Sequence, residues 1–305
     1  MRKEWLGAIS LTLAASIWGG MYVVSKYALG YIEPFTLVWM RYAVAFVVLF
    51  VMWGAFGRER IARSDWKWIA LVGVIGYVAS ISFQFIGTKL SDAHTGSLVT
   101  AATPAFMVIF ARVILKERLT PVKIGSLLLA TIGVIIVVGW RVEGTYFIGS
   151  LVLVGAAITW ALMSIYVKIA SETTSSLTIT TFAIGIAFVL MTPLMGMEVA
   201  ASGLPKMNMV LWLSVLYVGI ISTAGAFFFW NKGIELMDAS VGSLFFFFQP
   251  LVGGYLGWLV LDERLDRNFF IGAACIVTAV TWSTLAERRQ KRISDARLAS
   301  ERYIL

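Results

Sequence analysis

The sequence predicts an all-α polytopic membrane protein with ten transmembrane helices, arranged as a 5+5 inverted repeat around a central cavity. Three observations lead to this prediction. The 305 residues are 59% hydrophobic and 14% charged, whereas about a quarter of a soluble domain is charged. Ten apolar runs are each long enough to cross a bilayer, which takes about 20 residues. A pattern within residues 92–119 also recurs at 238–265.

The ten apolar runs are separated by short polar loops, as expected of a helical bundle that spans a membrane. Trp5, Trp66, Trp68, Trp140 and Trp212 lie near their ends, where an amphipathic ring favours the membrane interface. In chain order, the predicted spans are 6–28, 34–55, 68–88, 94–115, 122–140, 147–168, 176–196, 210–231, 239–261 and 268–286.

The distribution of Lys and Arg predicts the orientation, because cytoplasmic loops carry an excess of both. With the N-terminus inside, 17 of these residues fall on the inner side and six on the outer side, while Arg41 and Arg112 lie within spans. Both termini are therefore expected in the cytoplasm, and the chain in the inner or plasma membrane. The basic tail 287–305 is expected to lie on the anionic inner leaflet.

The internal repeat divides the chain into 1–142, 143–286 and the tail. At an offset of 146, residues 92–119 and 238–265 share ten identities in 28 positions. Each half holds five spans, and because five is odd, the second half should enter the membrane from the opposite side. Lys116 in the first copy has become Asp262 in the second, as a change of side would require. Inverted repeats of this kind are typical of transporters that expose a central site to each side in turn.

A proline recurs near the middle of spans 4 and 9, as Pro104 and Pro250. Proline removes a helical hydrogen bond, and such breaks within the bilayer are tolerated where protein or a wet cavity satisfies the backbone. Together with Gly96 and Gly242 from the shared Gly-Ser-Leu segment, these prolines are candidate helix-break and gating residues. The alternative is an ordinary kink in each helix.

Arg41 is the one strong charge well inside a span, and an ionisable residue within the membrane is a functional candidate by default. It could hold a substrate carboxylate in a bidentate grip. The alternative is that it extends toward the interface, or pairs with Glu33 or with backbone carbonyls. Arg112 lies about one turn from a span end and is expected to be an interfacial anchor.

Aromatic and polar side chains on matching helix faces complete the predicted substrate site. They suit a zwitterionic or aromatic amino acid, or an organic cation held over ring faces. The alternative is that the rings only pack between helices, although buried amides and hydroxyls need partners. The candidates are Trp18, Tyr22, Arg41, Tyr77, Ser80, Gln84, Thr100, Thr103, Trp160, Trp230, Phe246 and Gln249.

Residues that the sequence lacks exclude other classes of function. One cysteine (Cys275) and one histidine (His94) cannot supply a disulfide framework or a multi-histidine metal site, and no cofactor is expected. Since the basic residues lie in loops and the tail, no nucleic-acid partner is expected. The segment "SDAH" at 91–94 is the one candidate for an enzyme acting on lipid-linked substrates, and no second cluster faces it in the sequence.

The mode of transport is less constrained. Glu33, Asp92, Glu235 and Asp238 all sit at span ends, which argues against a carboxylate-centred proton antiporter. Facilitated diffusion or exchange is therefore expected. Proton coupling, exchange against a counter-substrate, and a monomer or a homodimer all stay open.

The motifs "ASIWGG" (15–20), "RYAVAF" (41–46), "GSLVTAATPAFMVIFARVILKERLT" (96–120), "IGVIIVV" (132–138) and "GSLFFFFQPLVGGYLGWLVLDERLD" (242–266) resemble the drug/metabolite transporter superfamily, in its ten-span EamA-type branch. The resemblance covers nearly the whole chain. It implies that spans 1–4 and 6–9 surround the cavity, with spans 5 and 10 at the periphery. It also implies transport of small metabolites, with amino-acid export as the first expectation and organic cations such as quaternary amines as the alternative. Arg41 departs from the repeat, because span 7 has no matching arginine.

Overall fold

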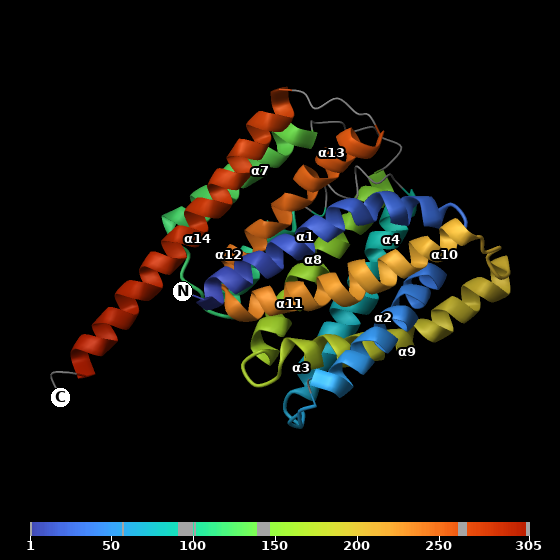
Figure 1. Cartoon of the computed structure of the whole chain (residues 1–305), viewed down its shortest axis with the longest axis horizontal. Coiled ribbons are helices and arrows are strands. Elements are labelled where there is room, and N and C mark those ends of the chain that lie inside the picture. The colour runs from blue at the N-terminus through green and yellow to red at the C-terminus, as the bar shows by residue number, and fades with distance from the viewer. Residues whose placement is uncertain are drawn as a thin grey trace.

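The chain folds into a bundle of long helices, seen in a computed structural model that describes residues 2–56, 58–90, 100, 102–138, 147–261 and 267–302 (Figure 1). The described residues contain no β-strand. The first half comprises α1 (Arg2–Leu29), α2 (Pro34–Phe56), α3 (Trp66–Leu71), η1 (Val72–Ser80), α4 (Ile81–Leu90), α6 (Thr103–Val113) and α7 (Pro121–Val138). The second half comprises α8 (Phe147–Ala170), α9 (Ser176–Ser202), α10 (Met209–Leu216), η3 (Tyr217–Gly225), α11 (Ala226–Leu236), α12 (Ala239–Ser243), η4 (Leu244–Phe247), α13 (Phe248–Leu261) and α14 (Arg267–Arg302).

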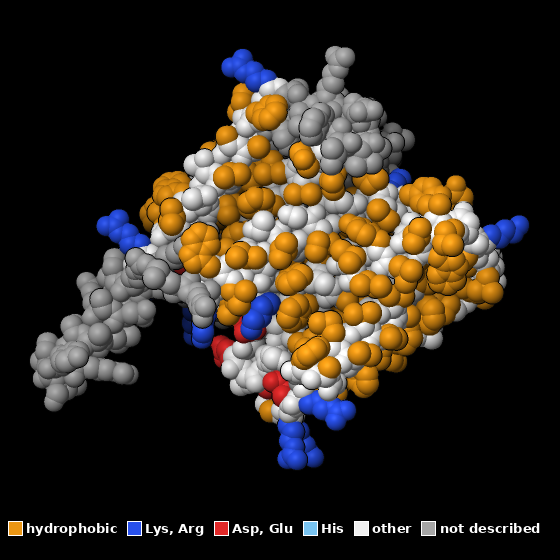
Figure 2. All heavy atoms as spheres, in the orientation of Figure 1, with side chains coloured by type: hydrophobic (Ala, Val, Ile, Leu, Met, Phe, Trp, Pro, Cys, Tyr) orange, Lys and Arg blue, Asp and Glu red, His pale blue; other side chains and the backbone are white. Residues whose placement is uncertain are grey.

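The helices have the length and composition of membrane spans. Among the described residues, seven helical stretches are long and apolar enough to cross a bilayer, and three shorter apolar helices accompany them: Thr103–Val113, Pro121–Ile136 and Ala239–Gly253. Hydrophobic side chains cover most of the face shown in Figure 2, and most of the visible Lys and Arg side chains lie at its margins. An exposed apolar surface of this extent is normal against lipid and rare in water. The chain is therefore a multi-pass membrane protein.

Two of the long helical stretches are interrupted by π-helices at corresponding places. η1 joins α3 to α4, and η3 joins α10 to α11. Both are nine residues long, and their first residues, Val72 and Tyr217, are 145 positions apart. A π-helix makes i→i+5 hydrogen bonds in place of i→i+4; it is rare in proteins and is frequently found at functional sites. The matched pair therefore makes the space between η1 and η3 a candidate for the functional site.

The proline-containing segments also change conformation. Pro104 lies in the first turn of α6, where a missing N–H costs little. The second copy passes from α12 through a 3₁₀ segment, η4, into α13, and Pro250 lies in the first turn of α13. Gly242 lies in α12. Gly96 and the turn at 262–266 lie outside the described residues.

α7 and α14 pack against each other at the edge of the bundle (Figure 1). These helices correspond to the predicted spans 5 and 10. α14 continues as one helix from Arg267 to Arg302, so the basic tail is helical as far as Arg302 and extends past the other helices in Figure 1.

A central cavity lined by aromatic rings and one arginine

A small cavity lies among the helices of both halves. It has a volume of about 20 Å³, which is room for about one water molecule. A solute of amino-acid size fits only if the surrounding helices move apart. The lining residues are Trp18, Met21, Arg41, Ser80, Ile81, Gln84, Thr100, Thr103, Ala156, Trp160, Phe227, Phe246 and Gln249.

Nine of the twelve residues predicted for the substrate site line this cavity, and none of the lining residues comes from α7 or α14. The other three, Tyr22, Tyr77 and Trp230, lie behind the lining. Met21, Ile81, Ala156 and Phe227 line it without having been predicted. Their types are common throughout the apolar spans, so nothing in the sequence distinguishes them.

Arg41 is completely buried and reaches the cavity from α2. Its Nε donates a hydrogen bond to the hydroxyl of Thr223 at 2.7 Å, and Nη2 makes a weak contact with the sulfur of Met21 at 3.9 Å. The guanidinium also lies over the rings of Phe85 (5.1 Å) and Phe227 (5.5 Å).

One nitrogen of this guanidinium, Nη1, makes no hydrogen bond. Nη1 is buried, and none of the described carboxylates forms an ion pair with Arg41. Glu33 pairs with Lys89 instead, so neither the pairing with Glu33 nor an extension toward the interface describes this arginine. A buried cation without a counter-ion is costly. Aromatic faces offset only part of that cost.

Trp18 of α1 is the centre of a ring cluster that forms one wall of the cavity. Its ring stands edge-on to Trp160 at 5.3 Å between centroids and stacks on Phe246 at 5.7 Å. Its Nε1 donates to the backbone oxygen of Ser222, in η3, at 3.0 Å. The indole is thus held in one orientation by its ring contacts and by its hydrogen bond.

Tyr22 supports the polar side of the cavity from behind. Gln84 Nε2 donates to the Tyr22 hydroxyl at 2.8 Å, and this hydroxyl lies 2.7 Å from Oγ1 of Thr100. The chain of contacts joins α1 to span 3 and to the segment that precedes α6. It also fixes the Gln84 amide, whose Oε1 is buried without a partner.

Tyr77 and Trp230 hold the wall in place without lining it. The Tyr77 ring stacks on Phe227 at 4.7 Å, and its hydroxyl accepts a hydrogen bond from Asn231 Nδ2 at 2.9 Å. Trp230 packs edge-on against Phe246 at 4.4 Å, and its Nε1 donates to Ser164 Oγ at 3.0 Å. Both side chains are fully buried, and both contact residues that line the cavity.

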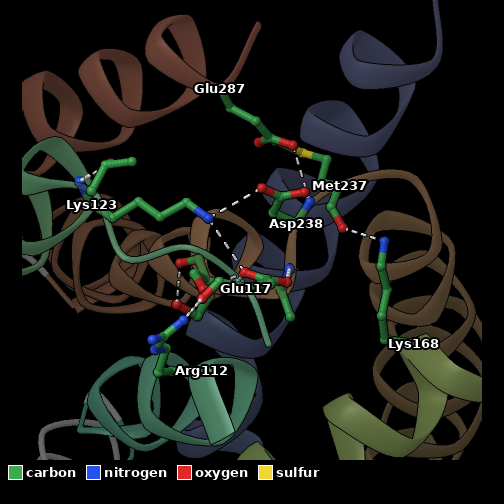
Figure 3. A network of polar contacts seen from close by, with 11 residues as sticks. Arg112, Glu117, Lys123, Lys168, Met237, Asp238 and Glu287 are labelled. Atoms are coloured by element: carbon green, nitrogen blue, oxygen red, sulfur yellow. Dashed lines mark hydrogen bonds and ion pairs between the residues drawn. The ribbon is translucent and has the colours of Figure 1, made fainter. Parts of the chain in front are cut away.

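A network of charged side chains lies at one end of the bundle (Figure 3). Glu117, in the loop that follows α6, accepts hydrogen bonds from the backbone nitrogens of Ala239 (2.8 Å) and Ser240 (3.3 Å), at the start of α12. The Ser240 hydroxyl donates to the same carboxylate. Lys123 joins Glu117 to Asp238, with Nζ at 3.4 and 3.1 Å from their oxygens. A carboxylate at a helix N-terminus also interacts favourably with the helix dipole.

Other predicted features fall outside this centre. Arg112 lies near the network at the bundle end, with Nη1 3.4 Å from the backbone oxygen of Glu117. His94 lies outside the described residues. In the part of the chain that the structure describes, no group of three His, Cys, Asp or Glu side chains is placed to hold a metal ion.

Comparison with known proteins identifies the family. The sequence pattern of the EamA-like transporter family matches residues 5–139 and again residues 147–285. The chain belongs to this family. It is 26% identical to an uncharacterized transporter of Bacillus subtilis (strain 168), YetK, over 99% of this chain and 93% of YetK. It is 24% identical to an uncharacterized transporter of Archaeoglobus fulgidus over 91% of this chain and 97% of the relative.

A shorter and a structural match complete the comparison. YdzE, a permease-like protein of Bacillus subtilis, is 54% identical over 65 residues, which are 21% of this chain and 83% of YdzE. A crystal structure of a protein that is 20% identical to this EamA-family chain superposes with a TM-score of 0.76, over 93% of this chain and 98% of the other. At that identity the superposition establishes a shared fold.

Proposed function

We propose that this EamA-family protein is a secondary transporter that moves small carboxylate-bearing metabolites across the cell membrane by alternating access. Amino acids with apolar or aromatic side chains are the foremost substrates, and export is the foremost direction. The observation that carries the proposal is the buried Arg41 guanidinium, whose Nη1 has no partner at the cavity. A carboxylate is the natural partner for such a group.

Pairs of equivalent features in the two halves support the ten-span inverted repeat. The family pattern matches the chain twice, and η1 and η3 interrupt equivalent helices. Lys26 binds the carbonyls of Thr88 and Lys89 at the end of α4, and Lys168 binds those of Ile234 and Glu235 at the end of α11. The seven long apolar stretches and the three shorter ones together match the number of crossings that the proposal requires.

The same features support alternating access with both termini in the cytoplasm. The network around Glu117 lies at the bundle end that also contains Lys123 and Lys168, which the charge bias assigns to the inner side. The hydrogen bonds and ion pairs of this network can be either formed or broken. A gate requires two discrete states of this kind.

An organic cation is the competing substrate, and the aromatic wall suits it. Arg41 argues against it. A second unpaired cation in a buried chamber would be repelled at the low effective dielectric constant of the interior. The carboxylate substrate removes this penalty, whereas the cation increases it.

The test is uptake and counterflow in proteoliposomes, with labelled leucine and phenylalanine against choline, with and without a proton gradient. Arg41→Gln should reduce amino-acid uptake by about 10-fold or more, as expected for loss of a hydrogen-bonded charge partner worth about 1.5–3 kcal/mol. Arg289→Gln, which alters an exposed cation on α14, is the matched control. If the wild-type protein takes up choline but neither leucine nor phenylalanine, the proposal is contradicted.

A further inference from the structure

The buried polar atoms that lack partners at the cavity form a complementary set. Three of them belong to residues that line it: Arg41 Nη1, Trp160 Nε1 and Gln84 Oε1. The first two are hydrogen-bond donors, and one of these is charged. The amide oxygen of Gln84 is an acceptor. Since unsatisfied buried groups are few in native proteins and each needs an explanation, three of them around one small chamber point to a ligand with matching groups.

The hydrogen bonds behind Gln84 determine which end of its amide faces the chamber. The Nε2 group donates to the Tyr22 hydroxyl at 2.8 Å, and that hydroxyl contacts Thr100 at 2.7 Å. The donor end of the amide is therefore engaged with α1, and the acceptor end is left for the chamber. An amide oxygen is neutral, so it can accept from an ammonium without forming an ion pair with Arg41 that would close the site.

A cavity with a guanidinium and a neutral acceptor has the polarity of a zwitterion. The two groups reach it from different helices, Arg41 from α2 and Gln84 from α4. The cavity has room for about one water molecule, so the two groups line a single small chamber. An α-amino acid carries its carboxylate and its ammonium on one carbon atom. Both groups could therefore be satisfied from one chamber once the walls separate enough to admit the rest of the molecule.

We propose that Gln84 Oε1 is the ammonium subsite and that it makes this site selective for α-amino acids over carboxylates without an amine. This inference rests on the proposed function, because it takes Arg41 as the carboxylate subsite. Gln84 binds substrate directly, while Tyr22 is a positioning residue that acts through Gln84. A substrate without the amine leaves Oε1 buried and unpaired. That arrangement disfavours it more than the loss of one contact would.

The test uses three ligands of one shape: L-phenylalanine, 3-phenylpropionate, which lacks the amine, and phenethylamine, which lacks the carboxylate. Their affinities are measured on detergent-purified full-length protein by quenching of tryptophan fluorescence, since Trp18 and Trp160 line the cavity, and by competition with leucine counterflow. Wild type should bind phenylalanine about 10- to 100-fold more tightly than 3-phenylpropionate, the range expected for a hydrogen bond to a charged group.

Substitutions at Gln84 separate the subsites. Gln84→Leu should bind phenylalanine no more tightly than 3-phenylpropionate, with binding of 3-phenylpropionate retained as evidence that the protein is folded. Gln84→Glu should improve binding of phenethylamine relative to wild type. Ser82→Ala is the matched control, because its hydroxyl contacts Met191 on another face of α4 and its loss should leave all three affinities unchanged.

The outcomes distinguish this inference from the proposed function. If Gln84→Leu weakens phenylalanine and 3-phenylpropionate equally, the ammonium subsite is wrong, while Arg41 as the carboxylate subsite is unaffected. If wild type binds 3-phenylpropionate as tightly as phenylalanine, the amide presents its donor end to the chamber and the inference is overturned. If phenethylamine alone binds, the proposed function fails, and the inference fails with it.

Discussion

Glu198 and Thr36 join the two halves of the chain at the start of α2. The carboxylate accepts hydrogen bonds from the Thr36 backbone nitrogen at 2.7 Å and from its hydroxyl at 2.9 Å. Glu59 makes the equivalent contact with Ser175 before α9, at 2.9 Å to the nitrogen and 2.7 Å to the hydroxyl. Glu198 lies near the C-terminal end of α9, and Glu59 follows the C-terminal end of α2. Each of the two helices therefore supplies a carboxylate that caps the N-terminus of the other.

We predict that Glu198→Ala and Glu59→Ala each destabilise the protein by about 1–3 kcal/mol, the cost of removing the charged partner from buried backbone donors. The measurement is thermal unfolding in detergent. Glu172→Ala, an exposed carboxylate in the loop before α9, is the control. Equal melting temperatures for all three variants would show that the reciprocal caps contribute nothing.

Acidification should remove the contribution of Glu59. Burial raises the pKa of this carboxyl, but hydrogen bonds from Thr178 and Ser175 outweigh burial and hold the pKa below its ordinary value. Its stabilisation is therefore complete above the unfolded-state pKa of about 4.3 and is lost as the pH falls through the lower folded-state pKa. The difference in melting temperature between wild type and Glu59→Gln should shrink below about pH 4. A constant difference from pH 7 to pH 3 would contradict this.

Thr223 positions the Arg41 guanidinium. Its hydroxyl donates to the Val218 carbonyl, five residues earlier in the π-helix, at 2.6 Å, and so presents a lone pair to Arg41 Nε. We predict that Thr223→Val weakens binding of carboxylate ligands by about 10-fold, because one hydrogen bond to a charged group is lost. Thr223→Ser should restore it. The measurement is KM and maximal uptake rate. A fall in rate with unchanged KM in Thr223→Val would mean that Thr223 does not orient the arginine for binding.

Much of this arrangement could be predicted from the sequence, because polar residues within membrane spans are energetically costly and therefore rare. Arg41 and Gln84 stand out in apolar runs, and the structure places both at the cavity. Pro104 and Pro250 pointed to changes in helix geometry, and each lies in the first turn of a new α-segment.

The π-helices could not be predicted in the same way. Their sequences, VGVIGYVAS and YVGIISTAG, contain no proline and have the composition of ordinary apolar helix. These segments pack closely against neighbouring helices, as where Gly219 meets Val44 of α2, and such tertiary contacts cannot be read from the local sequence. Phe227 was missed for a related reason. Two further phenylalanines follow it directly in the sequence. The orientation of α11 about its own axis decides which of the three rings faces the cavity.

Glu117 should act as a latch for the bundle end shown in Figure 3. Glu117→Gln keeps the shape of the side chain but removes the charge that binds Lys123 and the first residues of α12. We predict that a cysteine placed at the fully buried Ser243, in a Cys275→Ala background, becomes several-fold more reactive toward a membrane-impermeant thiol reagent when Glu117 is neutralised.

The reagent is added to inside-out vesicles, so that it reaches the side to which we assign this network. Glu172→Gln in the same background is the control and should leave the labelling rate unchanged. A Glu117→Gln variant that labels at the control rate would show that the network does not close this end.

Close approach of α1 and α13 beside the cavity gives a final prediction. A methyl group added at Gly19 would lie 2.8 Å from the backbone oxygen of Gln249 and 3.0 Å from Cβ of Val252. Because the nearest atom is backbone, the helices themselves must separate, and the adjacent Trp18 and Gln249 must move with them. Gly19→Ala should therefore lower substrate affinity by about 10-fold, as expected for a loss of about 1.4 kcal/mol.

Gly54→Ala on α2, where nothing lies within 4 Å of the added methyl, should leave transport unchanged and slightly stabilise the helix. Equilibrium binding and thermal unfolding of the two variants provide the comparison, and equal affinities would mean that the α1–α13 contact does not shape the site.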